Sequence, residues 1–142
     1  MGFHAEVYDA LERLIEAAVP GVSVLNELSV DEAYAEGFAK FVLILREGIN
    51  YVPHPEINPA TAVQDQMEQW SWLLLVKGGG GRANQAGKGI EVDKMLESIR
   101  TALNAQRLTT DCGPLQLQSE DYEGADSNGV VYGQRWSHFR MA

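Results

Sequence analysis

The segment with the greatest apparent capacity for chemistry is a glycine-rich tract, VKGGGGRANQAGKGI, at residues 76–90. A phosphate-binding P-loop requires a glycine, four further residues, and then Gly-Lys followed by Ser or Thr. The only Gly-Lys pair in this tract is Gly87-Lys88. Arg82 stands where the first glycine is required, and Gly89 stands where the magnesium-binding hydroxyl is required. The tract therefore lacks the P-loop motif.

The dinucleotide-binding fingerprint GxGxxG fits the same tract no better. Counting from Gly78 and Gly80, the third position is Ala83, which the looser form of the pattern tolerates. The predicted helix, however, begins near Ile90, whereas the fingerprint requires a helix that starts at the loop so that its N-terminus meets the pyrophosphate. We therefore interpret the tract as a connection between a strand and a helix.

The glycine-rich connection is basic on an otherwise acidic chain. From Gly78 to Gly89, Arg82 and Lys88 are the only charged residues. Because four consecutive glycines raise the entropic cost of any fixed conformation, we expect the connection to become ordered against a partner. The sequence thus favours a role in assembly over catalysis, with Arg82 and Lys88 in the contact.

Two other side chains could in principle carry out catalysis. His138 alternates with Trp136 and Arg140 on a predicted strand, but a catalytic histidine needs a nucleophile and an orienting acid, so we expect a solvated or interface histidine. Cys112 follows Asp111, which would raise the thiol pKa rather than lower it. We expect Cys112 to be an unreactive residue in a turn.

Acidic and aromatic clusters also have non-catalytic interpretations. The carboxylates of the segment SEDYEGAD lack the spacing of a calcium-binding loop, so a solvated hairpin tip is predicted there; they are Glu120, Asp121, Glu123 and Asp126. The three tryptophans are predicted to lie in the core or at a protein interface. No CxxC or HExxH pair is present. We predict no catalytic residue, no cofactor and no metal site.

Length and charge limit the possible functions. The 142 residues suit one domain, 1–142, and the chain is 45% hydrophobic, as in a globular protein. The formal net charge is −9, which disfavours specific DNA binding because phosphate affinity depends on Lys and Arg. No apolar run is long enough to span a bilayer, so we expect a soluble protein that does not bind membranes.

The hydrophobic pattern predicts two helices, over residues 3–19 and from about residue 90 to residue 107. Five predicted strands lie at residues 22–28, 38–47, 67–77, 114–123 and 129–141. The run at residues 38–47 is apolar on both alternations, so both of its faces should be covered. The proline-rich segment at residues 48–62 is predicted to be an extended loop.

This order of elements, α-β-β-β-α-β-β, predicts an α+β fold. The sheet should be mostly antiparallel, with the two main helices packed on one of its faces.

Three stretches together resemble the tail-terminator family of long-tailed bacteriophages, in the form found in Mu-like phages and prophages. They are QWSWLLLVKG, the helix IEVDKMLESIRTALNAQRL, and the closing GPLQLQSEDYEGADSNGVVYGQRWSHFRM. The similarity lies in a tryptophan-bearing strand, a helix containing L..IR.AL, and a last strand containing VY..R. It extends over residues 69–141.

The resemblance implies a structural virion protein located in the tail or neck and assembled in the host cytoplasm. Such a protein forms a ring, expected to be a hexamer, that caps the tail tube and ends its polymerisation. Its partners would be copies of itself, the tail tube protein and a neck or connector protein. DNA would pass through the acidic lumen without specific binding, because like charges repel.

Two alternatives remain open: another neck protein, such as a head-completion or head-to-tail connector component, and a small phosphate-binding enzyme built on the glycine tract. The residues expected at interfaces are Tyr51, His54, Gly78, Gly81, Arg82, Lys88, Arg135 and Arg140.

Overall fold

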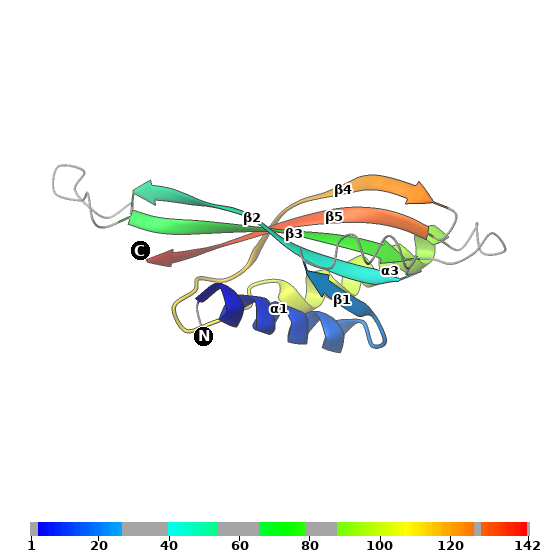
Figure 1. Ribbon diagram of the computed structural model, residues 1–142, viewed down its shortest axis with the longest axis horizontal. Coiled ribbons are helices and arrows are strands. Elements are labelled where there is room, and N and C mark those ends of the chain that lie inside the picture. Colours follow the sequence, from blue (N-terminus) through cyan, green and yellow to red (C-terminus); the bar gives the residue numbers. More distant parts are fainter. Residues whose placement is uncertain (1–2, 27–39, 54–65, 79–87, 127–128, 142) are drawn as a thin grey trace.

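The computed structural model describes residues 3–26, 40–53, 66–78, 88–126 and 129–141. The elements follow in the order α1 (Phe3–Ala18), β1 (Ser23–Asn26), β2 (Phe41–Pro53), β3 (Gln66–Gly78), α3 (Lys88–Leu103), β4 (Gln116–Asp126) and β5 (Gly129–Met141) (Figure 1). The predicted α+β class and the predicted element order are both confirmed.

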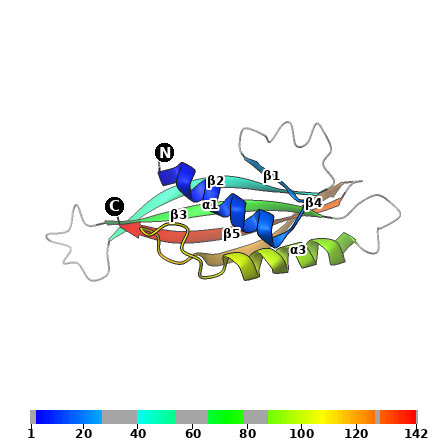
Figure 2. The ribbon, with the colours of Figure 1, turned by 90° about the horizontal axis from the view of Figure 1, so that it is seen from below.

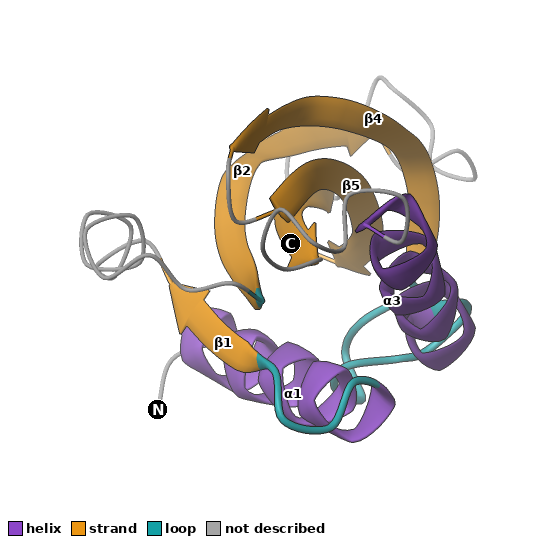
Figure 3. Ribbon diagram, turned by 90° about the vertical axis from the view of Figure 1, so that its right-hand side faces the viewer, coloured by secondary structure: helices purple, strands orange, loops and turns teal. Residues whose placement is uncertain are grey.

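The five strands form one sheet in the order β1-β2-β3-β5-β4. The short β1 pairs with β2 in parallel, and the other three pairings are antiparallel. The sheet is strongly twisted and curled when it is viewed along the long axis of the molecule (Figure 3). Both helices lie on the same side of the sheet (Figures 1 and 3), as the sequence predicts.

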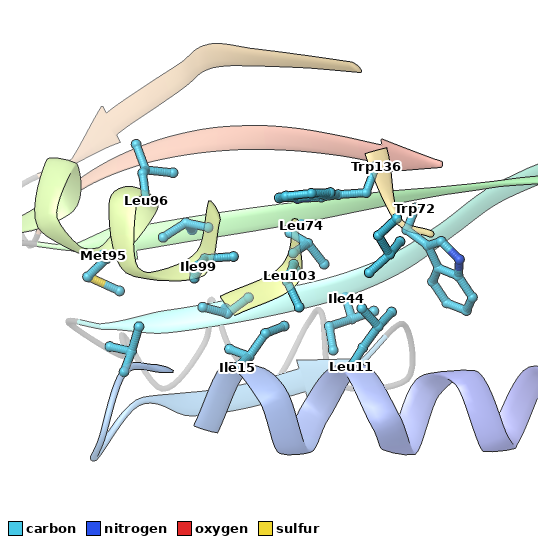
Figure 4. Packing of buried hydrophobic residues seen from close by; sticks show 14 of the residues in the cluster. Leu11, Ile15, Ile44, Trp72, Leu74, Met95, Leu96, Ile99, Leu103 and Trp136 are labelled. Carbon is cyan, nitrogen blue, oxygen red and sulfur yellow. The ribbon is translucent and has the colours of Figure 1, made fainter. Parts of the chain in front are cut away.

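The main core lies between the helices and one face of the sheet, which we call the helix face. Residues spaced by three or four positions on each helix meet residues spaced by two on each strand, as amphipathic packing requires. Figure 4 shows the two layers of side chains interdigitating. The fully buried members include Leu11, Ile15, Ile44, Trp72, Leu74, Ile99, Leu103 and Trp136.

The second helix ends four residues earlier than predicted. α3 stops at Leu103, because the backbone N–H of Ala105 donates to the carbonyl of Leu115 instead of continuing the helix. Ala105 has a φ of 62°, which lies in the left-handed region. The prediction that the helix reaches Arg107 is therefore wrong.

The strand predicted to end at Glu47 is also longer in the structure. β2 passes through an irregularity between Arg46 and Gly48 and stays paired with β3 as far as Pro53. Among the described residues, β1 pairs only with the first four residues of β2, so within that part of the chain Pro53 has a strand partner on one side alone, where a missing N–H is tolerated. The predicted loop therefore begins at least six residues too early.

The first residues of β2 are buried on both sides of the sheet, as the sequence predicts. Val42 and Ile44 pack against the helices, whereas Phe41 and Leu43 are buried on the opposite face. On that face the Lys77 ammonium lies over the ring of Phe41, 5.8 Å from its centroid. This aromatic contact accompanies the burial of a lysine side chain.

Two glycines allow β5 and α3 to approach the end of β3 closely. A Cβ atom on Gly129 would lie 2.5 Å from the carbonyl oxygen of Gly78, and one on Gly78 would lie 3.1 Å from the Cα of Val92. Both are backbone atoms, so a larger residue would displace backbone, and at Gly78 it would also meet the Met95 sulfur at 2.7 Å. Gly78 therefore has a packing role.

We predict that Gly129→Ala lowers the free energy of unfolding by about 1–3 kcal/mol, because the added methyl overpacks against backbone. Gly48→Ala is the matched control, since its Cβ would meet nothing within 4 Å, and its effect should stay within about 0.5 kcal/mol. Urea unfolding of both variants measures the difference. Equal stability of the two variants would contradict this packing.

Candidate assembly surfaces

His138 is not a solvated residue. Its side chain is fully buried on β5, stacked near Trp70 and Trp72 at centroid distances of 6.2 and 6.4 Å. The indole N–H of Trp72 donates to His138 Nε2 over 3.0 Å. This bond occupies the nitrogen that a general base would use. Because the side chain is fully buried, the expectation of a solvated or interface histidine is wrong.

Burial also sets the charge state of His138. Desolvation lowers its pKa from 6.5 to about 4, and the neutral ring with its proton on Nδ1 is the form that accepts the Trp72 hydrogen bond. His138 is therefore a structural member of the core.

The carboxylates predicted to lie at a hairpin tip belong to β4 itself. Glu120 accepts hydrogen bonds from Arg100 at 2.6 and 2.7 Å and from Gln134 at 2.8 Å. Buried Gln134 in turn accepts the indole N–H of Trp136 and donates to the carbonyl of Leu96. This network links α3 to the sheet. Sequence spacing did not indicate that Glu120 pairs with Arg100 of α3.

Cys112 lies in an isolated bridge with Arg140 and is buried. Its Sγ is 3.2 Å from Thr109 Oγ1. The predicted turn cysteine is thus held against the end of β5, with little access for a reagent.

The predicted interface residues are distributed over the fold. Tyr51 and Arg140 are brought together, because Glu68 is the cross-strand partner of both. Arg135 lies on the opposite face, where it forms ion pairs with carboxylates of β2 and β4: Glu47, Asp121 and Glu123. Gly78 is buried at the end of β3.

The other predicted interface residues are less defined by the structure. Lys88 is the first residue of α3, and His54, Gly81 and Arg82 lie outside the described residues.

β2, β3 and β5 extend beyond the first turn of α1 (Figures 1 and 2), and these strands carry a surface on which Tyr51 and Arg46 are exposed and Arg140 and Glu68 are partly exposed. We call it the arm surface and define it by four side chains: Arg46, Tyr51, Glu68 and Arg140. Tyr51 is 58% exposed. The Arg46 guanidinium lies 5.6 Å from the Trp70 ring centroid, and Arg140 lies 3.7 Å from Glu68. Sequence reasoning missed Arg46 and Glu68, although Arg46 interrupts an apolar run.

A second surface is a groove of about 620 Å³ between α1 and the segment after α3. We call it the α1 groove. Its lining consists of Glu6, Asp9, Glu12, Arg13, Glu16, Leu108 and Thr109. Burial, a hydrogen bond with Glu16, and repulsion from Glu16 and Asp9 raise the pKa of Glu12. The groove is therefore an acidic site in which the carboxylates repel one another.

Over the described ranges, no group of three or more His, Cys, Asp or Glu residues is arranged to hold a metal ion. Within the same part of the chain, no helix is both long and apolar enough to cross a membrane.

Comparison with known proteins shows a likeness in fold to solved structures. No protein-family model matches the sequence, and no curated protein matches it. The fold is similar to that of a chain in the virion of a native gene transfer agent (GTA) particle, with a TM-score of 0.57 and 11% sequence identity. The similarity covers 98% of this chain and 93% of that chain. The two chains therefore share a fold over nearly their whole lengths.

The buried His138 predicts an acid-sensitive core. Because its folded pKa of about 4 lies below the ordinary value of 6.5, the unfolded state binds the proton more readily. The stability that neutral His138 contributes is fully present above about pH 6.5 and is lost as the pH falls towards 4. Between pH 7.5 and pH 5 the free energy of unfolding should fall by about 2 kcal/mol.

Urea unfolding across this pH range checks the value, with His138→Gln as the comparison. Glutamine can accept the Trp72 hydrogen bond but does not titrate, so the pH-dependent loss should shrink. If the two proteins show equal pH dependence, His138 is not the titrating group.

Proposed function

We propose that this protein is a structural component of a phage-like virion and that it forms the ring that terminates the tail tube. The principal support is the shared fold with a chain of the gene transfer agent virion, which extends over nearly the whole of both chains. The sequence resemblance to tail terminators gives the more specific role. The protein acts without catalysis or a cofactor.

The charge of the chain suits a ring through which DNA passes. The formal net charge of −9 is repeated in every copy, so a closed ring presents a strongly acidic lumen. Phosphates are repelled by such a surface, and the genome can move through without binding. Head-to-tail contacts in a closed ring also leave no free interface. The expected copy number is six.

The ring has two further partners. One face meets the tail tube protein, and the other meets a neck or connector protein. The glycine-rich connection contributes two basic residues, Arg82 and Lys88, to one of these contacts or to the contact between copies. The protein is located in the virion tail or neck after assembly in the host cytoplasm.

Disruption of the gene tests the role directly. Electron microscopy of the resulting particles should show overlong tail tubes without heads, because nothing ends tube polymerisation. Tails of normal length beside unattached heads would contradict termination and would place the protein in the head-to-tail connector.

The double variant Arg82→Glu/Lys88→Glu should reduce incorporation into particles at least tenfold, because it reverses both charges of the basic connection. The double variant Lys40→Glu/Lys94→Glu is the matched control, since it changes the net charge by the same amount elsewhere. Quantitative immunoblotting of purified particles measures incorporation, and circular dichroism checks folding. Normal incorporation of the first variant would exclude these residues from the contact.

A further inference from the structure

The arm surface has the composition of a protein contact. Tyr51 is one of two large hydrophobic side chains that are strongly exposed among the described residues. Its cross-strand neighbour is Glu68, which pairs with Arg140 at 3.7 Å, and Arg46 lies over Trp70, so the arm surface carries two arginines and one carboxylate. Tyrosine and arginine are enriched at the centres of protein interfaces, because each combines a large contact area with polar groups.

The α1 groove has the complementary charge. Four carboxylates line it beside one arginine, Arg13, whose Nε lies 3.4 Å from the carbonyl oxygen of Asp9. An adjoining hollow of about 330 Å³ shares Arg13 and Leu108 and adds Ala10, Leu14, Gln106 and Arg107. Arg107 donates a hydrogen bond to the Cys112 carbonyl, so both groove arginines have contacts within the chain.

Apolar side chains lie where the groove meets the adjoining hollow. Leu108 lines both, Leu14 lines the hollow, and both leucines are partly buried against the core cluster. An aromatic ring could lie across them while its basic neighbours reached the carboxylates above. The net acidic charge remains available to a partner, since four carboxylates face two arginines over the combined lining.

We propose that the arm surface of one copy binds in the α1 groove of a second copy of this chain. Tyr51 packs on Leu14 and Leu108, and Arg46 and Arg140 approach the carboxylates of α1. This inference rests on the proposed function, in which the chain assembles with itself, and it names the two surfaces that meet.

The contact is head-to-tail, because the arm surface and the α1 groove are different parts of the chain. Such a contact leaves each copy with one free arm and one free groove until the chain of copies closes. It therefore generates a closed ring when the rotations from one copy to the next add up to a full turn. Charge complementarity also favours the correct register between copies.

Tyr51→Ala tests the arm surface. It should reduce incorporation of the protein into particles at least tenfold, because it removes the aromatic anchor without altering the core. Tyr122→Ala is the matched control, since Tyr122 is 60% exposed on β4, outside both surfaces. Equal incorporation of the two variants would overturn the proposal.

Cysteine cross-linking tests whether the two surfaces are neighbours. The pair Tyr51→Cys/Glu12→Cys should give a ladder of covalent oligomers when particles are oxidised, whereas Tyr122→Cys/Glu12→Cys should give monomers. Particles with the native sequence are oxidised in parallel as the background control, because the one native cysteine, Cys112, is buried. A protein that is present in particles but forms no ladder with the first pair would overturn this contact and leave the proposed function standing.

The failure of the proposed function has a different signature. If the wild-type protein is absent from purified particles, both the proposed function and this contact are overturned.

Discussion

The fold depends on burying two helices against a face of the sheet that carries tryptophans. Trp72 and Trp136 supply large apolar areas, but each indole also brings an N–H into a dry core, where an unmet hydrogen bond is costly. The sheet provides the acceptors from within: His138 for Trp72 and Gln134 for Trp136. The positions of α1 and α3 follow from these contacts, and with them the positions of the exposed surfaces.

The surfaces proposed for assembly result from the same packing. Because α1 buries one side against the sheet, its acidic residues are gathered on the outer side, where they line a groove. Because β2, β3 and β5 are longer than the helix layer, their ends carry exposed residues such as Tyr51 beyond it. Arg135 forms ion pairs with three carboxylates of its own chain, whereas Arg140 of the arm surface forms one, with Glu68. The fold thus separates a basic aromatic surface from an acidic one.

Local periodicity was sufficient to predict most elements, because each helix or strand must present a continuous apolar side. The predicted strand at residues 129–141 coincides with β5, and α1 ends one residue before the predicted boundary. Properties that depend on distant partners could not be predicted. The burial of His138 depends on Trp72, 66 residues away, and the role of Glu120 depends on Arg100. The extension of β2 through Pro53 depends on its pairing with β3.

The most direct test of the central claim is a cryo-electron microscopy map of intact particles at the end of the tail tube nearest the head. The account predicts a closed ring of copies at that position, with each density fitted by two helices on one face of a five-stranded sheet. Density for this fold elsewhere in the particle, or a ring at that position with a different fold, would contradict it.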